Sequence, residues 1–137
     1  MHGFRRQAQH IKATHQVDIN HTFERFQRVR ALAPVLNDKL STLADHPLVG
    51  EVRSCGFIGA IELVRDKKTR ARFEPEGRVG LVAREHCVAN GLIMRACWDT
   101  LVFAPPFSIS EADMDEWVIR LGRALDATLA DVSQETA

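Results

Sequence analysis

Near its C-terminal end the chain reads Gly91-Leu-Ile-Met-Arg95-Ala-Cys-Trp-Asp-Thr-Leu-Val-Phe-Ala-Pro-Pro-Phe-Ser-Ile-Ser110. Two short apolar runs, 92–96 and 101–104, flank a turn, which predicts two adjacent strands of one sheet. Pro105-Pro106 follows the second run, and proline has no backbone N–H to donate to a strand ladder, so the second strand ends there. Arg95 is the one charged residue of the first run. The segment thus predicts a hairpin that carries an arginine.

Three stretches on either side of this hairpin repeat apolar residues every three or four positions, which predicts amphipathic α-helices. They run from residue 23 to about 45, from 76 to 90, and from 110 to about 132. Their predicted inward residues are Phe23, Phe26, Val29, Ala33, Leu36, Leu40 and Leu43; Val79, Val82, Ala83 and Cys87; and Met114, Trp117, Leu121, Leu125 and Leu129. Pro34 predicts a kink or a helix restart. Ser110 and Asp113 predict a capping box before the last helix.

The segment 49–64 is rich in branched residues and broken by glycines, so it predicts a strand that is bent or hairpin-like. The order of elements predicts an α+β fold, with a small, mostly antiparallel sheet covered by amphipathic helices. We expect residues 23–132 to form one domain. Residues 1–22 are expected to be a loosely ordered or partly helical leader, and residues 133–137 a frayed tail.

The amino-acid composition argues against several classes of function. Lysine plus arginine and aspartate plus glutamate each number 18 in 137 residues, and this zero net charge argues against a nucleic-acid partner. No apolar run approaches a membrane span or a signal-peptide core, which favours a cytoplasmic protein. Cys55, Cys87 and Cys97 are interpreted as small core residues in a reducing compartment. The histidines lack the paired spacing of a metal site.

Together with Val49-Gly-Glu-Val-Arg-Ser-Cys-Gly-Phe-Ile-Gly-Ala-Ile-Glu-Leu63, the 91–110 segment resembles the C-terminal small domain of class III aminotransferases. These fold-type-I, pyridoxal-phosphate (PLP) enzymes include the omega-amine:pyruvate transaminases. The resemblance covers about residues 28–131. It implies amino-group transfer from an amine or omega-amino acid to a keto acid such as pyruvate. A complete enzyme of that family is several times longer than this chain.

The resemblance gives Arg95 a role. In the family, the arginine of this motif reaches over the cofactor, binds the α-carboxylate of the substrate, and swings aside for amines. A guanidinium suits this task because its planar fork donates two parallel hydrogen bonds to a carboxylate. The residues alone leave an alternative open, in which Arg95 is a strand-end arginine paired with Asp99 or Glu62.

Trp98 departs from the family pattern, which usually has glycine there. A positive φ at this turn would strain a tryptophan by about 1–2 kcal/mol. Its ring could form a wall of the substrate pocket. Alternatively, the substitution indicates a copy of the domain that is no longer under selection for catalysis.

Transamination also needs a lysine that forms a Schiff base with PLP. Neither Lys12, Lys39, Lys67 nor Lys68 stands in the family's cofactor-lysine context. We therefore expect no catalytic or cofactor-binding residue in this chain and no PLP binding by the chain alone.

Two interpretations follow. The chain is expected to be a truncated transaminase fragment, inactive alone, whose partner is a large domain or a full-length transaminase subunit, dimeric as in the family. The alternative is a non-catalytic α+β binding or assembly module derived from that domain. In either case, we expect an apolar face near Phe57, Phe103, Phe107 and Trp98 to favour self-association.

Overall fold

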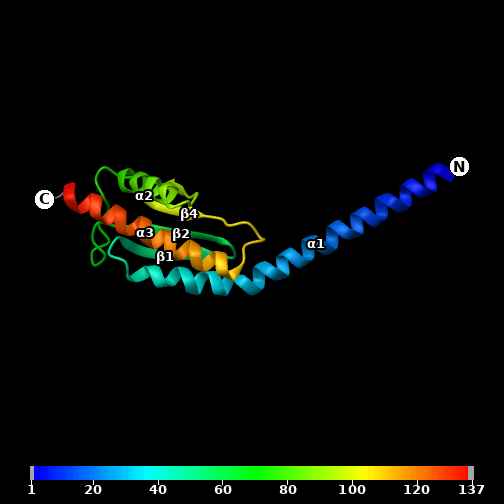
Figure 1. The fold of residues 1–137 in the computed structure, drawn as a ribbon, viewed down its shortest axis with the longest axis horizontal. Helices are drawn as coiled ribbons and strands as arrows, with labels where there is room; N and C mark the ends of the chain where they lie inside the picture. Colours follow the sequence, from blue (N-terminus) through cyan, green and yellow to red (C-terminus); the bar gives the residue numbers. More distant parts are fainter. Residues whose placement is uncertain (1, 136–137) are drawn as a thin grey trace.

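The computed structural model describes the backbone of residues 2–135 and the side chains of residues 19–134. The elements, in chain order, are α1 (His2–Ser41), the 3-10 helix η1 (Thr42–Asp45), β1 (Val49–Cys55), β2 (Ile58–Leu63), α2 (Arg78–Ala89), β3 (Arg95–Cys97), β4 (Thr100–Phe103) and α3 (Glu111–Glu135). Figure 1 shows α1 projecting from a layered domain that the other elements form. The predicted α+β class is confirmed.

Within the described residues the strands form one antiparallel sheet in the order β1-β2-β4-β3. The two runs of the 91–110 segment are neighbours in it, as predicted, and Arg95 pairs with Val102. The 49–64 segment is a hairpin whose strands β1 and β2 turn at Gly56 and Phe57. The sheet is therefore two hairpins joined along β2 and β4.

The sheet is covered on one face. Successive strand side chains point to opposite faces, and in β2 and β4 the inward set is Ile61, Leu63, Leu101 and Phe103, all buried. They share one core with α1, α2 and α3 through Leu36, Leu40, Val79, Ala83, Cys87, Met114, Leu121 and Leu125. The alternate residues Ala60, Glu62, Thr100 and Val102 remain partly exposed. In the described part of the chain, no second layer covers that bare sheet face.

Gly59 allows the sheet to pack this tightly. It lies opposite Phe103 in the β2–β4 ladder, and a Cβ on Gly59 would stand 2.0 Å from the Phe103 ring. The ring instead lies across the glycine and contacts Trp117 of α3, with centroids 4.6 Å apart. The glycine of the 49–63 motif is therefore structural, because it makes room for an aromatic residue of the core.

Helix α1 differs from its prediction. It is already helical at His2 and runs through Pro34 without a restart, although its axis bends where it meets the domain (Figure 1). Phe23 and Phe26, predicted to face the core, are 63% and 59% exposed. The core-facing stripe is correct only from Val29 onward, because the N-terminal part of the helix projects beyond the domain (Figure 1). At the other terminus the tail 133–137 was expected to fray, but residues 133–135 are helical in α3, which ends at Glu135, and residues 136–137 fall outside the described residues.

The connection from β4 to α3 is held at both ends. Arg28 of α1 donates hydrogen bonds to the carbonyl oxygens of Phe107 at 3.0 Å and Ile109 at 2.6 Å. The predicted capping box is confirmed: the Asp113 N–H donates to Ser110 Oγ at 3.1 Å, and Ser110 N–H donates to Asp113 Oδ2 at 3.0 Å. The Ser110 hydroxyl also donates to Asp113 Oδ2 at 2.6 Å, and this bond, together with the bond from the Ser110 N–H, lowers the pKa of the Asp113 carboxyl.

Burial corrects two further predictions. Phe57 and Phe103, expected on an exposed apolar face, are buried, whereas Trp98 and Phe107 are exposed. Phe57 packs edge-on against Phe107, with centroids 6.2 Å apart. The face therefore carries less aromatic surface than predicted.

The cysteines were predicted to be core residues, and only one of them is. Cys87 is buried, and burial raises its pKa to about 11. Cys55 and Cys97 are exposed, because the alternation of β1 and β3 places them on the bare sheet face.

Candidate functional site

The β3–β4 turn is fixed to the first turn of α2. The Asp99 carboxylate accepts the N–H of Gly77 at 2.9 Å through Oδ2 and the N–H of Gly80 at 2.8 Å through Oδ1. These are donors that a helix leaves unsatisfied at its N-terminus, so Asp99 acts as a cap supplied from a distant part of the sequence. Gly80 permits the approach, since a Cβ there would lie 1.9 Å from the Trp98 carbonyl oxygen. The hairpin is thereby held rigidly against α2.

Trp98 stands in this turn, directly before Asp99. Its φ is +54°, in the left-handed region, so the condition for strain is met. Its ring lies toward the start of α2, where a Cβ on Gly77 would be 3.5 Å from Trp98 Cε3. The indole is 71% exposed there.

Arg95 begins the edge strand β3 and is exposed. Neither carboxylate considered as its partner binds it: Asp99 caps α2, and Glu62 pairs with Arg70 at 3.1 Å. Among residues 19–134 the Arg95 guanidinium makes no ion pair or side-chain hydrogen bond. Its charge is therefore available to a ligand.

Arg95 lines a shallow pocket of about 380 Å³ at the β3 edge of the sheet. A second arginine, Arg84 of α2, lines it too, and the other lining residues are apolar: Ile93, Met94, Val102, Phe103 and Ala104. Trp98 is not part of this wall, because the turn directs its ring toward α2's first turn. Arg84 carries no sequence signal of this position, because helical spacing does not show that it stands beside Arg95, 11 positions later.

The chemistry of this pocket is that of an anion site. Two guanidinium groups line it with no acidic side chain among its lining residues. The other lining side chains are apolar and carry no charge that would compete, and a guanidinium binds a carboxylate through charge-assisted hydrogen bonds. The arrangement can hold and orient an anionic small molecule.

Sequence comparison assigns the family. Residues 11–125 match the family described as aminotransferase class-III. The chain belongs to this family. The match begins earlier than the expected residue 28 and ends before residue 131, so it includes part of α1 that lies outside the predicted domain.

Relatives of this class III aminotransferase chain are much longer than it is. It is 49% identical over 107 residues to the putrescine–pyruvate aminotransferase of Pseudomonas aeruginosa, covering 77% of this chain and 23% of that protein. It is 33% identical over 102 residues to gamma aminobutyrate transaminase 1 of Solanum lycopersicum, covering 74% and 20%. The omega transaminase of Pseudomonas jessenii, solved with PMP, superposes with a TM-score of 0.78 at 34% identity, over 85% of this chain and 26% of that one. The chain thus spans about a quarter or less of these relatives.

The lysines whose side chains the structure describes do not fit the cofactor that the family implies. Lys39 forms an ion pair with Asp115, and Lys67 donates to the carbonyl oxygens of Ala44 at 2.6 Å and His46 at 3.2 Å. Lys68 lies in an exposed loop, and the Lys12 side chain falls outside the described residues. No described lysine lines the Arg95 pocket. We therefore derive no PLP chemistry from this chain's residues.

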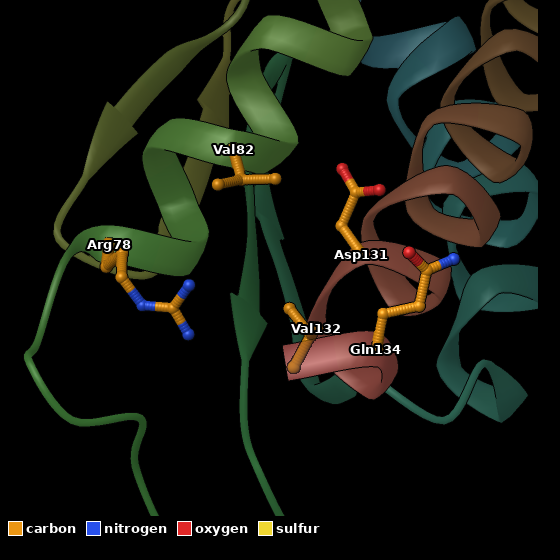
Figure 2. Close-up of a pocket in the computed structure, with 5 residues that line it drawn as sticks. All are labelled: Arg78, Val82, Asp131, Val132 and Gln134. Carbon is orange, nitrogen blue, oxygen red and sulfur yellow. The ribbon is translucent and has the colours of Figure 1, made fainter. Parts of the chain in front are cut away.

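A second pocket, of about 290 Å³, lies between α2 and the end of α3. Figure 2 shows Arg78 and Val82 projecting from α2, and Asp131, Val132 and Gln134 from α3. Asp131 Oδ2 stands 2.7 Å from His86 Nε2. Because this pocket mixes charges of both signs that already have partners, it offers less to a ligand than the Arg95 pocket.

The described residues bear on two other expectations. They contain no cluster of three or more histidine, cysteine, aspartate or glutamate side chains able to hold a metal ion. None of their helices is both long and apolar enough to cross a membrane.

Proposed function

We propose that this chain acts as the small domain of a PLP-dependent class III transaminase, with residues 23–132 as the functional unit. In this role Arg95 binds the carboxylate of an amino acid or keto acid above a cofactor that a large domain holds. The observation that carries the proposal is an unpaired Arg95 in an apolar-walled pocket at the sheet edge. The chain's own contribution is to bind and orient the substrate.

The proposed reaction is amino-group transfer from an amine or omega-amino acid to a keto acid such as pyruvate. The names of the relatives support this class, since they include putrescine–pyruvate and gamma-aminobutyrate transaminases. An arginine that binds carboxylate and can move into solvent suits an enzyme whose substrates include both carboxylates and simple amines.

The proposed partner is a large domain or a full-length transaminase subunit, in a dimeric cytoplasmic enzyme. The bare sheet face supports this partner, because in the part of the chain that the structure describes, helices cover only the other side of the sheet. A protein surface that supplies the cofactor lysine would cover this face and close the Arg95 pocket.

A chimaera tests the proposal. Residues 28–132 replace the corresponding segment of a large-domain-bearing relative, and Arg95→Ala is compared with the unsubstituted chimaera. We expect the variant to lose about 1.5–3 kcal/mol of binding free energy for carboxylate substrates, the range for hydrogen bonds to charged groups, and to keep its affinity for simple amines. Steady-state kinetics with an amino acid and a matched amine measure both. Equal losses for the two substrates would show that Arg95 only supports the fold.

The second candidate is a non-catalytic binding or assembly module. Trp98 favours it, because a strained tryptophan stands where the family usually has glycine. A chimaera that folds and assembles but transfers no amino group, and regains activity with Trp98→Gly, would support this alternative.

A further inference from the structure

Arg84 shares the pocket with Arg95 but comes from another element. It lies on α2, is exposed, and its guanidinium makes no ion pair or side-chain hydrogen bond with any residue among 19–134. Two positive charges in one pocket repel each other unless an anion lies between them. None of the side chains that line this pocket supplies one.

The two arginines are held by rigid elements. Asp99 and Gly80 fix the β3–β4 hairpin to the start of α2. At the other end of α2, Cys87 Sγ contacts Met94 Sδ at 3.7 Å, and both residues are buried. The strand that carries Arg95 and the helix that carries Arg84 therefore keep a fixed relative position. Because both arginines project from backbones that are already held, an anion that binds them orders two side chains and no mobile loop.

We propose that Arg84 is a specificity-determining residue and that the pocket prefers dicarboxylates, with one carboxylate on Arg95 and the other on Arg84. This inference rests on the proposed function of Arg95. A monocarboxylate satisfies one guanidinium and leaves the second uncompensated, whereas a dicarboxylate satisfies both. A volume of about 380 Å³ lies at the small-molecule end of the range for ligand pockets. Within the keto-acid class of the proposed function, this pocket therefore favours a 2-oxo dicarboxylate over a monocarboxylate such as pyruvate.

The test uses the full 137-residue chain, uniformly labelled with ¹⁵N, titrated with glutarate and separately with butyrate at constant ionic strength. Amide chemical shifts report binding and its location. The variants are Arg84→Gln, Arg84→Lys and Arg95→Gln. The matched control is Arg123→Gln, which removes an exposed arginine of α3 that does not line the pocket.

We expect glutarate to shift amides of both α2 and β3 and to bind more tightly than butyrate. Arg84→Gln should weaken glutarate about tenfold and leave butyrate unchanged, and Arg84→Lys should retain part of the preference because it keeps the charge. Arg95→Gln should weaken both ligands, and Arg123→Gln neither.

An unchanged glutarate-to-butyrate ratio in Arg84→Gln overturns the inference but leaves the role of Arg95 intact. An Arg95→Gln variant that binds butyrate normally contradicts the proposed function instead. Equal weakening by Arg123→Gln, or no glutarate-induced shift near either arginine, would show only general surface attraction and would also overturn the inference.

Discussion

Trp98 adopts a backbone conformation that is strained for a residue other than glycine. Its backbone is left-handed with φ of +54°, which costs a non-glycine residue about 1–2 kcal/mol, and its exposed ring recovers little of this by burial. We expect Trp98→Gly to raise the free energy of unfolding by about 0.5–1 kcal/mol, as the glycine's greater unfolded-state entropy offsets part of the relief. Urea denaturation followed by circular dichroism measures it.

Ile93→Gly is the control for that substitution. Ile93 is 96% exposed and is not among the residues with positive φ, so glycine there relieves no strain. It should lower stability slightly through chain entropy alone. If both substitutions destabilise the protein alike, the Trp98 turn is not strained.

His46 is a described residue whose titration is coupled to folding near neutral pH. Its side chain is 11% exposed, and its Nδ1 accepts the Leu48 N–H at 3.2 Å. Burial lowers its pKa below 6.5, with Asp126, 3.3 Å from Nε2, opposing the shift. A pKa lowered by folding means that the unfolded chain binds the proton more readily. The stability present at higher pH is therefore lost as pH falls below about 6.5 toward the folded-state pKa.

The free energy of unfolding should fall by up to about 1.4 kcal/mol per pH unit, which is the limit when one proton is bound. His46→Asn should flatten the profile as pH falls below 6.5, because the amide oxygen can still accept the Leu48 N–H and does not titrate. Denaturant midpoints across this pH range provide the measurement. A variant whose profile matches the parent would assign the pH dependence to other groups.

Among the elements, α2 depends most on a residue outside itself. Its N-terminal N–H groups at Gly77 and Gly80 donate to the two carboxylate oxygens of Asp99. Asp99→Asn keeps the shape but replaces one acceptor with an NH₂ donor, which leaves one helix N–H without its partner. We expect a loss of about 1–2 kcal/mol in the free energy of unfolding.

Asp38→Asn controls for loss of charge, since Asp38 is exposed on α1 and should change stability by less than about 0.5 kcal/mol. Hydrogen exchange locates the effect: amides in the first turn of α2 and in the 97–100 turn should lose protection together. Loss of protection spread evenly over the domain would contradict a local cap.

At the scale of the molecule, the bare sheet face is the surface to test. One row across it reads Arg53, Ala60, Val102 and Arg95 from β1 to β3. Beside this row Ile58 is exposed, and toward the other end Glu51 and Glu62 pair with Arg70. The face therefore has an apolar part and a charged part, and we expect the isolated chain to self-associate through the apolar part.

Ile58→Glu should shift the chain toward monomer in sedimentation velocity, because a charge placed in an apolar contact is desolvated without a partner. Ile119→Glu, at an exposed isoleucine of α3 away from the sheet, serves as the control. A parent chain that stays monomeric at high concentration would contradict the prediction.

The cofactor provides another whole-molecule prediction. Lys39 and Lys67 are engaged by Asp115 and by backbone carbonyls, and Lys68 is in an exposed loop. After incubation with PLP and reduction with borohydride, mass spectrometry should find only scattered, low-level labelling of exposed lysines. A single stoichiometric adduct at one lysine would overturn this prediction.

Part of the site could be read from residue order. The Gly91–Ser110 pattern placed Arg95 on a hairpin strand, and the structure puts it at the start of β3 opposite Val102. The position of Arg84 beside Arg95 could not be predicted this way. Helical and strand periodicities indicate which face of an element is buried. They do not indicate which exposed residues of two elements lie next to each other. Residue order also left Asp99 open as a partner of Arg95, because Asp99 is only four positions away. In the folded protein its carboxylate instead accepts hydrogen bonds from the first turn of α2.

By itself, the sequence determined the elements of the domain, the pairing of the two hairpin strands and the helix cap at Ser110, since these depend on neighbours within a few residues. Only the tertiary structure decided burial. Phe23 and Phe26 repeat at helical spacing yet face solvent because α1 outruns the sheet, and Cys55 and Cys97 are exposed because no layer covers their face in the described residues. Periodicity records which residues share a face, whereas burial requires another element to pack against that face.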